Sequence, residues 1–143
     1  MKKYSSFALI LVLVILASCG STNKMSKSLT SLSKNDWQLY SLNAQQYKAG
    51  EVGKIPKLSF DATKMQVSGN TGCNSLSGLF TSEKDKLSFG QLATTRMACP
   101  SDNIEPQFLD ALSKTSKFSI YEGKLVLNDA DGKQLMVMEP SIR

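Results

Sequence analysis

Cysteine is the residue type with the most distinctive chemistry in this sequence, and the chain has three, Cys19, Cys73 and Cys99. A cysteine sulfur can act as a nucleophile, bind a metal, carry a lipid or form a disulfide. The sequence contains no histidine, which excludes a Ser-His-Asp or Cys-His catalytic pair and the commonest metal ligand. Two thiols without histidine support a zinc site poorly, so we expect no metal and no cofactor.

The segment before Cys19 has the features of a bacterial export signal. Met1-Lys2-Lys3 is a positively charged start, and residues 7–17 form an unbroken apolar run. Such a run is too short to span the hydrocarbon core as a helix, so we expect cleavage before Cys19. Leu16-Ala17-Ser18-Cys19 resembles the lipobox of bacterial lipoproteins, which implies that Cys19 carries membrane-anchoring acyl chains. An ordinary signal peptide with a coincidental cysteine and an uncleaved anchor are the alternatives. Gly20 is compatible with sorting to the outer membrane.

The expected organisation is a signal peptide over residues 1–18, a lipidated Cys19 with a flexible tether over residues 19–34, and one folded domain over residues 35–143. Ser, Thr and Lys dominate the tether, which shows no sustained apolar period. Loss of the signal lowers the Lys and Arg count from 17 to 15 against 12 acids, so the net charge falls from +5 to +3. The lysines form no basic stripe, and we expect no nucleic-acid binding.

Short alternating apolar runs separated by turn residues predict antiparallel strands. The runs lie at residues 37–40, 58–60, 65–67, 76–80, 87–89, 118–120, 125–127 and 135–138. Glu122-Gly123 and Asp131-Gly132 predict tight hairpins between the last three runs. The polar stretch 43–54 predicts a loop.

One segment has helical periodicity instead. Its apolar stripe consists of Ile104, Phe108, Leu109, Ala111 and Leu112. Ser101, Asp102 and Asn103 are N-cap candidates, and Glu105 suits the positive end of the helix. Pro106 is tolerated only in a first turn, so the helix must begin near residues 103–105. We therefore predict an α+β fold, mostly antiparallel β, with a curved sheet or open barrel and one covering α-helix.

Cys73 and Cys99 remain if Cys19 is lipidated, and export would place both where disulfides persist. A bond between them would close a loop of about 27 residues, which stabilises a fold by about 3–4 kcal/mol in the chain-entropy model. Two buried thiols and a redox pair are the alternatives. A redox pair usually shows closer spacing, such as C-x-x-C. The disulfide is our prediction.

Three sequence elements together resemble the META domain family. Residues 72–80 match its GCN-x-x-x-G-x-[YF] element, residues 95–99 its T-x-M-A-C element, and residues 105–112 its E-x-x-F-L-x-A-L element, in the family's order. The family includes HslJ-like heat-shock proteins. The resemblance implies a compact bacterial envelope domain, often a lipoprotein, of mostly antiparallel β-structure with one helix. It implies a stress- or envelope-related role without an established enzymatic activity, so there is no catalytic residue to carry over.

Asn74 and Arg96 are the remaining candidate site residues. Asn74 lies in the Gly- and Asn-rich stretch 69–80, where it can hydrogen-bond the turn. After loss of the signal the chain has thirteen Lys and only two Arg. Arg96, near Cys99, is therefore predicted to use its planar donor fork to clamp loop carbonyls in the stretch 69–78. Binding a carboxylate or phosphate ligand is the alternative.

Two functions remain for comparison. The first, which we predict, is a non-enzymatic, monomeric envelope lipoprotein at the periplasmic face of the outer membrane that binds an envelope protein or stabilises an assembly. No enzyme is expected, because no base is placed to activate a hydroxyl. The alternative is a module that binds a lipid or small hydrophobic ligand in an apolar cavity. Its lining would come from Met65, Met97, Met136 and Met138.

Overall fold

The computed structural model describes residues 22–48 and 54–141. This part of the chain holds two helices and nine strands: α1 (Thr22–Ser33), β1 (Asp36–Leu42), β2 (Gln45–Gln46), β3 (Lys57–Asp61), β4 (Gln66–Asn70), β5 (Ser75–Glu83), β6 (Lys86–Thr94), α2 (Glu105–Lys114), β7 (Lys117–Tyr121), β8 (Lys124–Asn128) and β9 (Gln134–Ser141). The predicted signal peptide, Cys19 and part of the predicted loop 43–54 lie outside the described residues.

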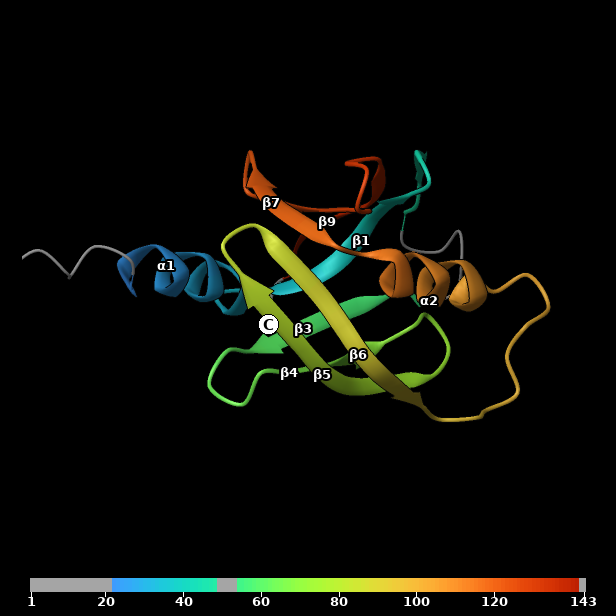
Figure 1. Ribbon diagram of the computed structural model, residues 1–143. Coiled ribbons are helices and arrows are strands. Elements are labelled where there is room, and N and C mark those ends of the chain that lie inside the picture. The colour runs from blue at the N-terminus through green and yellow to red at the C-terminus, as the bar shows by residue number, and fades with distance from the viewer. Residues whose placement is uncertain (1–21, 49–53, 142–143) are drawn as a thin grey trace, which may run out of the picture.

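All nine strands belong to one antiparallel sheet, which curves until β1 and β9 pair (Figure 1). The order is β2-β1-β3-β4-β5-β6-β7-β8-β9, so the β1–β9 pairing turns eight of the strands into a ring. The join between β6 and β7 is the shortest, with the single register pair Lys86 and Lys117. The prediction of a mostly antiparallel, curved sheet in an α+β domain is confirmed.

The inner face of the ring is the hydrophobic core. Trp37 and Leu39 on β1 are buried, and burial alternates along the first half of this strand as the period of two predicts. Across the core, Phe60 on β3 and Phe80 on β5 pack edge to face with ring centroids 5.2 Å apart. Closure leaves few unpaired strand edges, which is one way that β-proteins avoid edge-to-edge association.

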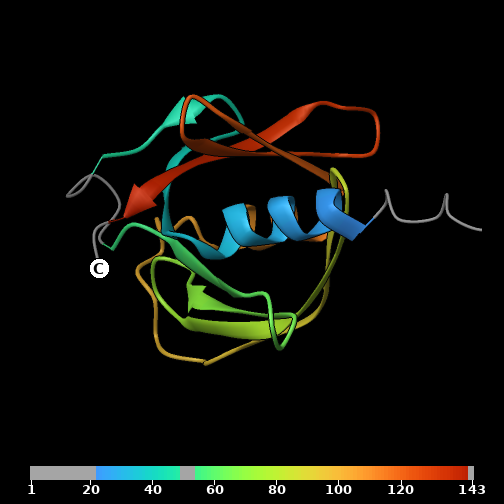
Figure 2. The ribbon, with the colours of Figure 1, turned by 90° about the vertical axis from the view of Figure 1, so that its left-hand side faces the viewer.

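The prediction of a single helix, and of a flexible tether for the described part of residues 19–34, is corrected, because Thr22–Ser33 form helix α1. It lies across one end of the ring (Figure 2). Leu32 on its last turn is fully buried in the core and Leu29 packs against that core. The indole Nε1 of Trp37 donates a 2.8 Å hydrogen bond to the Leu32 carbonyl. Two leucines three residues apart are too weak a periodic signal by themselves, but a hydrophobic opening in the ring gives them a surface to bury.

Helix α2 is the helix that the sequence predicts. Phe108, Ala111 and Leu112 are buried from it, and it packs against β6 and β1. Its N-cap is Ile104, which has no capping side chain. Asn103 is therefore not the cap, but its side chain accepts a 3.0 Å hydrogen bond from the first helical N–H. Ser101 and Asp102 are exposed and do not cap the helix either.

Both predicted hairpins are present, but only the one between β7 and β8 is tight. Glu122 and Gly123 both have positive φ, 49° and 75°, in the two-residue turn between β7 and β8, as a twisted hairpin requires. Gly132 has φ of 88° in the longer connection between β8 and β9. The predicted loop over residues 43–54 is corrected at its start, because a tight turn at Asn43 leads into the short strand β2.

Candidate functional site

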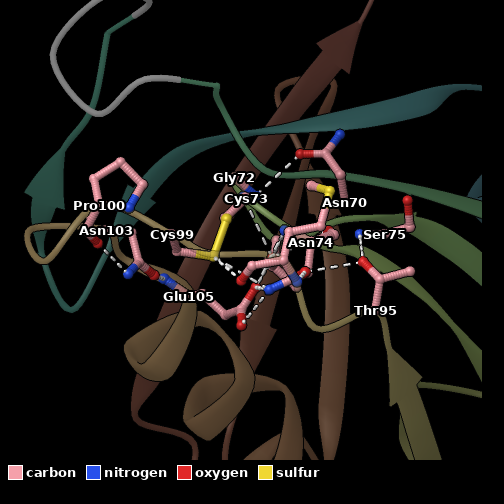
Figure 3. The surroundings of a disulfide bond; sticks show 12 residues. Asn70, Gly72, Cys73, Asn74, Ser75, Thr95, Cys99, Pro100, Asn103 and Glu105 are labelled. Carbon is pink, nitrogen blue, oxygen red and sulfur yellow. Dashed lines mark hydrogen bonds between the residues drawn. A yellow bond between two sulfur atoms is a disulfide. The ribbon is translucent and has the colours of Figure 1, made fainter.

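The three sequence elements that resemble one family meet at one end of the ring (Figure 3). The loop between β4 and β5 contributes Thr71, Cys73 and Asn74, the segment after β6 contributes Thr95 and Cys99, and the first residue of α2 is Glu105. We call these six residues the clasp. They are the densest group of linked polar side chains in the described part of the chain, so the clasp is the candidate site to test for chemistry.

The covalent part of the clasp is a disulfide between Cys73 and Cys99. It joins residues 26 apart in sequence, with Cα atoms 5.9 Å apart. The predicted pair is confirmed, and the alternatives of two buried thiols or a redox dithiol do not describe this structure. The bond ties the β4–β5 loop to the irregular segment that leads into α2.

Asn74 is the centre of the hydrogen-bond network and is only 3% exposed. Its Oδ1 accepts hydrogen bonds from the Thr95 hydroxyl at 2.9 Å and the Met97 N–H at 2.8 Å. Its Nδ2 donates to the Glu105 carboxylate at 3.0 Å and contacts Cys99 Sγ at 3.2 Å. The side-chain amide therefore uses both its acceptor and its donor capacity within the protein. The sequence predicts that the Asn74 side chain hydrogen-bonds its own turn, and this is corrected, because the side chain instead holds the segment after β6 and the start of α2.

The carboxylate of Glu105 is the second hub. Its two oxygens accept hydrogen bonds from the Asn74 side-chain amide, and Oε2 also accepts from the Asn74 N–H at 3.3 Å and from the Thr71 hydroxyl. A carboxylate in the first turn of α2 also suits the partial positive charge of that helix end. Glu105 thus fixes the start of α2 to the β4–β5 loop.

Backbone geometry makes the loop possible. Gly72 has φ of 95°, and a Cβ there would lie 2.9 Å from the Lys54 carbonyl oxygen. A larger residue would therefore be strained both by the backbone angle and by this close contact. Asn70 supports the same turn, because its Oδ1 accepts a 3.0 Å hydrogen bond from the Gly72 N–H. Thr71 is fully buried, and its hydroxyl accepts a 3.0 Å hydrogen bond from the Asn74 N–H.

The predicted clamp role of Arg96 is wrong. Its side chain is exposed, and within residues 22–48 and 54–141 its guanidinium forms no hydrogen bond or ion pair. Asn74 already holds Thr95 and Met97, the residues on either side of it. This segment is therefore fixed without a cationic clamp.

The arrangement of the clasp is suited to holding three chain segments together. Both cysteine sulfurs are in the disulfide, and the carboxylate and amide bond to each other. Over the described ranges, no cluster of three or more His, Cys, Asp or Glu side chains could hold a metal ion. In the same ranges, no helix has the length and apolar character needed to cross a membrane.

The four methionines proposed to line a cavity do not share one. Met136 and Met138 are fully buried in the core, Met65 only packs against it, and Met97 is 58% exposed beside the clasp. Surface hollows of about 580, 560 and 230 Å³ occur among the described residues, and no methionine lines these hollows. The expected lining is therefore corrected, because Met136 and Met138 lie in the continuously buried run 135–138 of β9 and pack into the interior.

A comparison with known protein families identifies the family of this chain. The META domain profile matches residues 30–141, which include the whole clasp. The chain belongs to the META domain family. In this META domain, the clasp is where the three family-like sequence elements meet. None of the curated proteins compared with the chain matches it.

Solved structures share the fold of this META domain. A protein from Burkholderia xenovorans, determined by NMR, is 25% identical with a TM-score of 0.65, over 90% of this chain and 94% of that one. A second NMR structure is 24% identical with a TM-score of 0.62, over 78% of this chain and 93% of the other. A crystal structure of a DUF4847 family protein from Bacteroides vulgatus, 10% identical, has a TM-score of 0.57 over 78% and 96% of the two chains.

Sequence reasoning missed Thr71, Thr95 and Glu105 as members of the clasp. From the sequence, Glu105 is expected only to favour the helix end. A usable signal was present, because Glu105 opens the third family-like element and Thr71 directly precedes the first. Their contact joins residues 34 apart, a pairing that no local pattern encodes.

Proposed function

We propose that this META domain protein is a non-enzymatic lipoprotein of the bacterial cell envelope. Acyl chains on Cys19 would hold it at the periplasmic face of the outer membrane, where the folded domain binds a partner or supports an assembly, including under stress. The order of positive start, apolar run and lipobox-like residues before Cys19 supports the anchor.

The proposal depends mainly on one observation: the distinctive polar residues of the clasp bond to one another. Cys73 and Cys99 form a disulfide, a bond typical of compartments outside the cytoplasm. Asn74 and Glu105 satisfy each other's hydrogen-bonding groups. Residues that would otherwise be the first candidates for catalysis thus hold the fold, which supports a role for the domain surface in binding.

The anchor and the disulfide can be tested together in a Gram-negative host that expresses the full chain. We expect the protein in the outer-membrane fraction, with an intact mass that includes acyl chains and with no thiol alkylated in the unfolded chain without reductant. The matched control Cys19→Ser should lose the acyl mass and leave the outer-membrane fraction but keep the disulfide. Wild-type protein that lacks acyl mass contradicts the anchor, and alkylation at Cys73 and Cys99 contradicts the oxidised compartment.

The binding role has its own test. In-cell crosslinking of the lipidated protein, followed by mass spectrometry, should give the same neighbouring envelope protein in repeated experiments, and the Cys19→Ser control should lose that neighbour. Crosslinks that vary from one experiment to the next would contradict a specific partner.

A further inference from the structure

One end of the ring, opposite the clasp, carries α1 and a projecting hairpin. Strand β7 pairs with β6 at one position only, Lys117 with Lys86. The rest of β7 therefore runs past the β5–β6 turn, paired with β8 alone. Figure 1 shows the turn after β7 on the same side of the molecule as α1. We call α1, the β5–β6 turn and the β7–β8 hairpin together the α1 end. Neither the clasp nor the proposed function involves these elements.

The α1 end exposes apolar side chains. Ile120 and Tyr121, consecutive residues at the end of β7, are 39% and 67% exposed, and two other large hydrophobic residues are comparably exposed in the described ranges, Leu79 and Met97. A hollow of about 580 Å³ opens between α1 and β7, with Phe118 and Ile120 as its apolar lining. Ile120 lines the hollow, and Tyr121 ends the same strand on its other face, so the tip of this hairpin exposes apolar surface on both sides.

Chain length places this end close to the proposed anchor. Two residues separate Cys19 from Thr22, the first residue of α1. At most about 11 Å of extended chain and about 9 Å of helix therefore separate Cys19 from Ser28, which lies beside the hollow. The clasp lies at the far end of β5, a nine-residue strand about 30 Å long. A lipidated Cys19 would hold the α1 end, and not the clasp end, against the membrane.

The chemistry of this end suits a lipid headgroup region. A tyrosine ring with a polar tip is typical of membrane interfaces. The β5–β6 turn carries Glu83, Lys84, Asp85 and Lys86, whose charges cancel, whereas the sequence of α1 has two lysines and no acid. The resulting positive charge favours anionic headgroups, so the contact should weaken as the salt concentration rises.

We propose that the α1 end lies on the bilayer that holds the acyl chains of Cys19, with Ile120 and Tyr121 in the headgroup region. This inference rests on the proposed lipid anchor. The domain is then oriented, with the clasp directed away from the membrane and toward the periplasm.

The test uses tryptophan reporters in the full mature, lipidated protein, reconstituted in phosphatidylethanolamine and phosphatidylglycerol vesicles with brominated acyl chains. Tyr121→Trp places the reporter at the α1 end, and the matched control Met97→Trp places it at the clasp end, where Met97 is similarly exposed. Trp37 is 1% exposed, and its emission is subtracted with the wild-type protein. We expect the brominated lipid to remove about half of the emission added at residue 121 and to leave that at residue 97 unchanged.

The possible outcomes distinguish a wrong orientation of the domain from a missing lipid anchor. Equal quenching at both positions, or none at residue 121, in protein that floats with the vesicles overturns the orientation alone. A residue-121 reporter that is shielded from aqueous iodide but not quenched by brominated lipid shows that a second copy or a protein partner covers this end, which also overturns the inference. Protein that does not float with the vesicles overturns the anchor and the inference together.

Discussion

Replacing Asn74 by alanine should destabilise the domain by about 4 kcal/mol. The substitution removes an acceptor for two neutral donors, the Thr95 hydroxyl and the Met97 N–H, each bond contributing about 1 kcal/mol. It also removes the amide that donates to the Glu105 carboxylate, a bond to a charged group that contributes about 1.5–3 kcal/mol. The backbone bonds of residue 74 remain, so the loss reports on the side chain.

The assay is urea unfolding of the oxidised, unacylated Cys19→Ser chain, followed by fluorescence. Trp37 reports the native state, because it is buried and its indole donates to the Leu32 carbonyl. The matched control is Asn70→Ala, which removes the side-chain oxygen that accepts a hydrogen bond from the Gly72 N–H. This substitution should lower the free energy of unfolding by about 1 kcal/mol. Arg96→Lys should leave the midpoint unchanged, because the side chain is exposed.

Two results would refute this reasoning. Asn74→Ala could lower the free energy of unfolding by no more than Asn70→Ala does. In that case the buried hydrogen-bond network contributes no more than the single hydrogen bond of the turn, and the clasp does not stabilise the fold. If Arg96→Lys lowers stability as much as Asn74→Ala does, the guanidinium is the clamp after all. An unchanged slope of free energy against urea is needed for both comparisons, since a changed slope indicates a different unfolding transition.

Three further predictions follow from other parts of the fold. Reduction of the Cys73–Cys99 bond, which spans 26 residues, should lower the free energy of unfolding by about 3.5 kcal/mol, measured in urea with and without reductant. Leu32→Ala should cost about 2–5 kcal/mol in the same assay, because the side chain is fully buried, whereas a residue in a flexible tether would cost nothing. Hydrogen bonds from the Lys64 and Thr63 backbone hold the pKa of Asp61 below its usual value, so its contribution to stability should be present above the unfolded pKa and lost as pH falls through the folded one. NMR titration of the Asp61 carboxyl checks this, and a pKa at or above 3.8 would contradict it.

Local pattern was enough to predict every strand of the described residues except β2. Alternation around Trp37 and Leu39 reflects one buried and one outer face, a property of each strand by itself. The turn at Glu122 and Gly123 was equally predictable, because positive φ at both positions is a local requirement. The disulfide partners could be predicted by counting the cysteines, because Cys73 and Cys99 are the pair that remains when Cys19 is expected to carry lipid.

Arg96 and helix α1 show where local pattern was insufficient. The scarcity of arginine suggested that Arg96 clamps loop carbonyls, but whether a long charged side chain is needed depends on which neighbours already hold the segment. Asn74 holds it instead. The residues of α1 looked like a solvated linker because two leucines among polar residues do not make a stable helix alone.

Local sequence patterns encode most of the elements of this protein: every strand except β2, the amphipathic helix α2 and the hairpin turns. Long-range contacts bring β1 and β9 together to close the ring, place α1 across one end of it and bring Glu105 to the loop of Asn74. These contacts cannot be read from local patterns, because periodicity and turn chemistry act over a few residues. The closing pair Gln38 and Glu139 and the contact between Asn74 and Glu105 join residues 101 and 31 apart, and form only when burial of the common core brings these segments together.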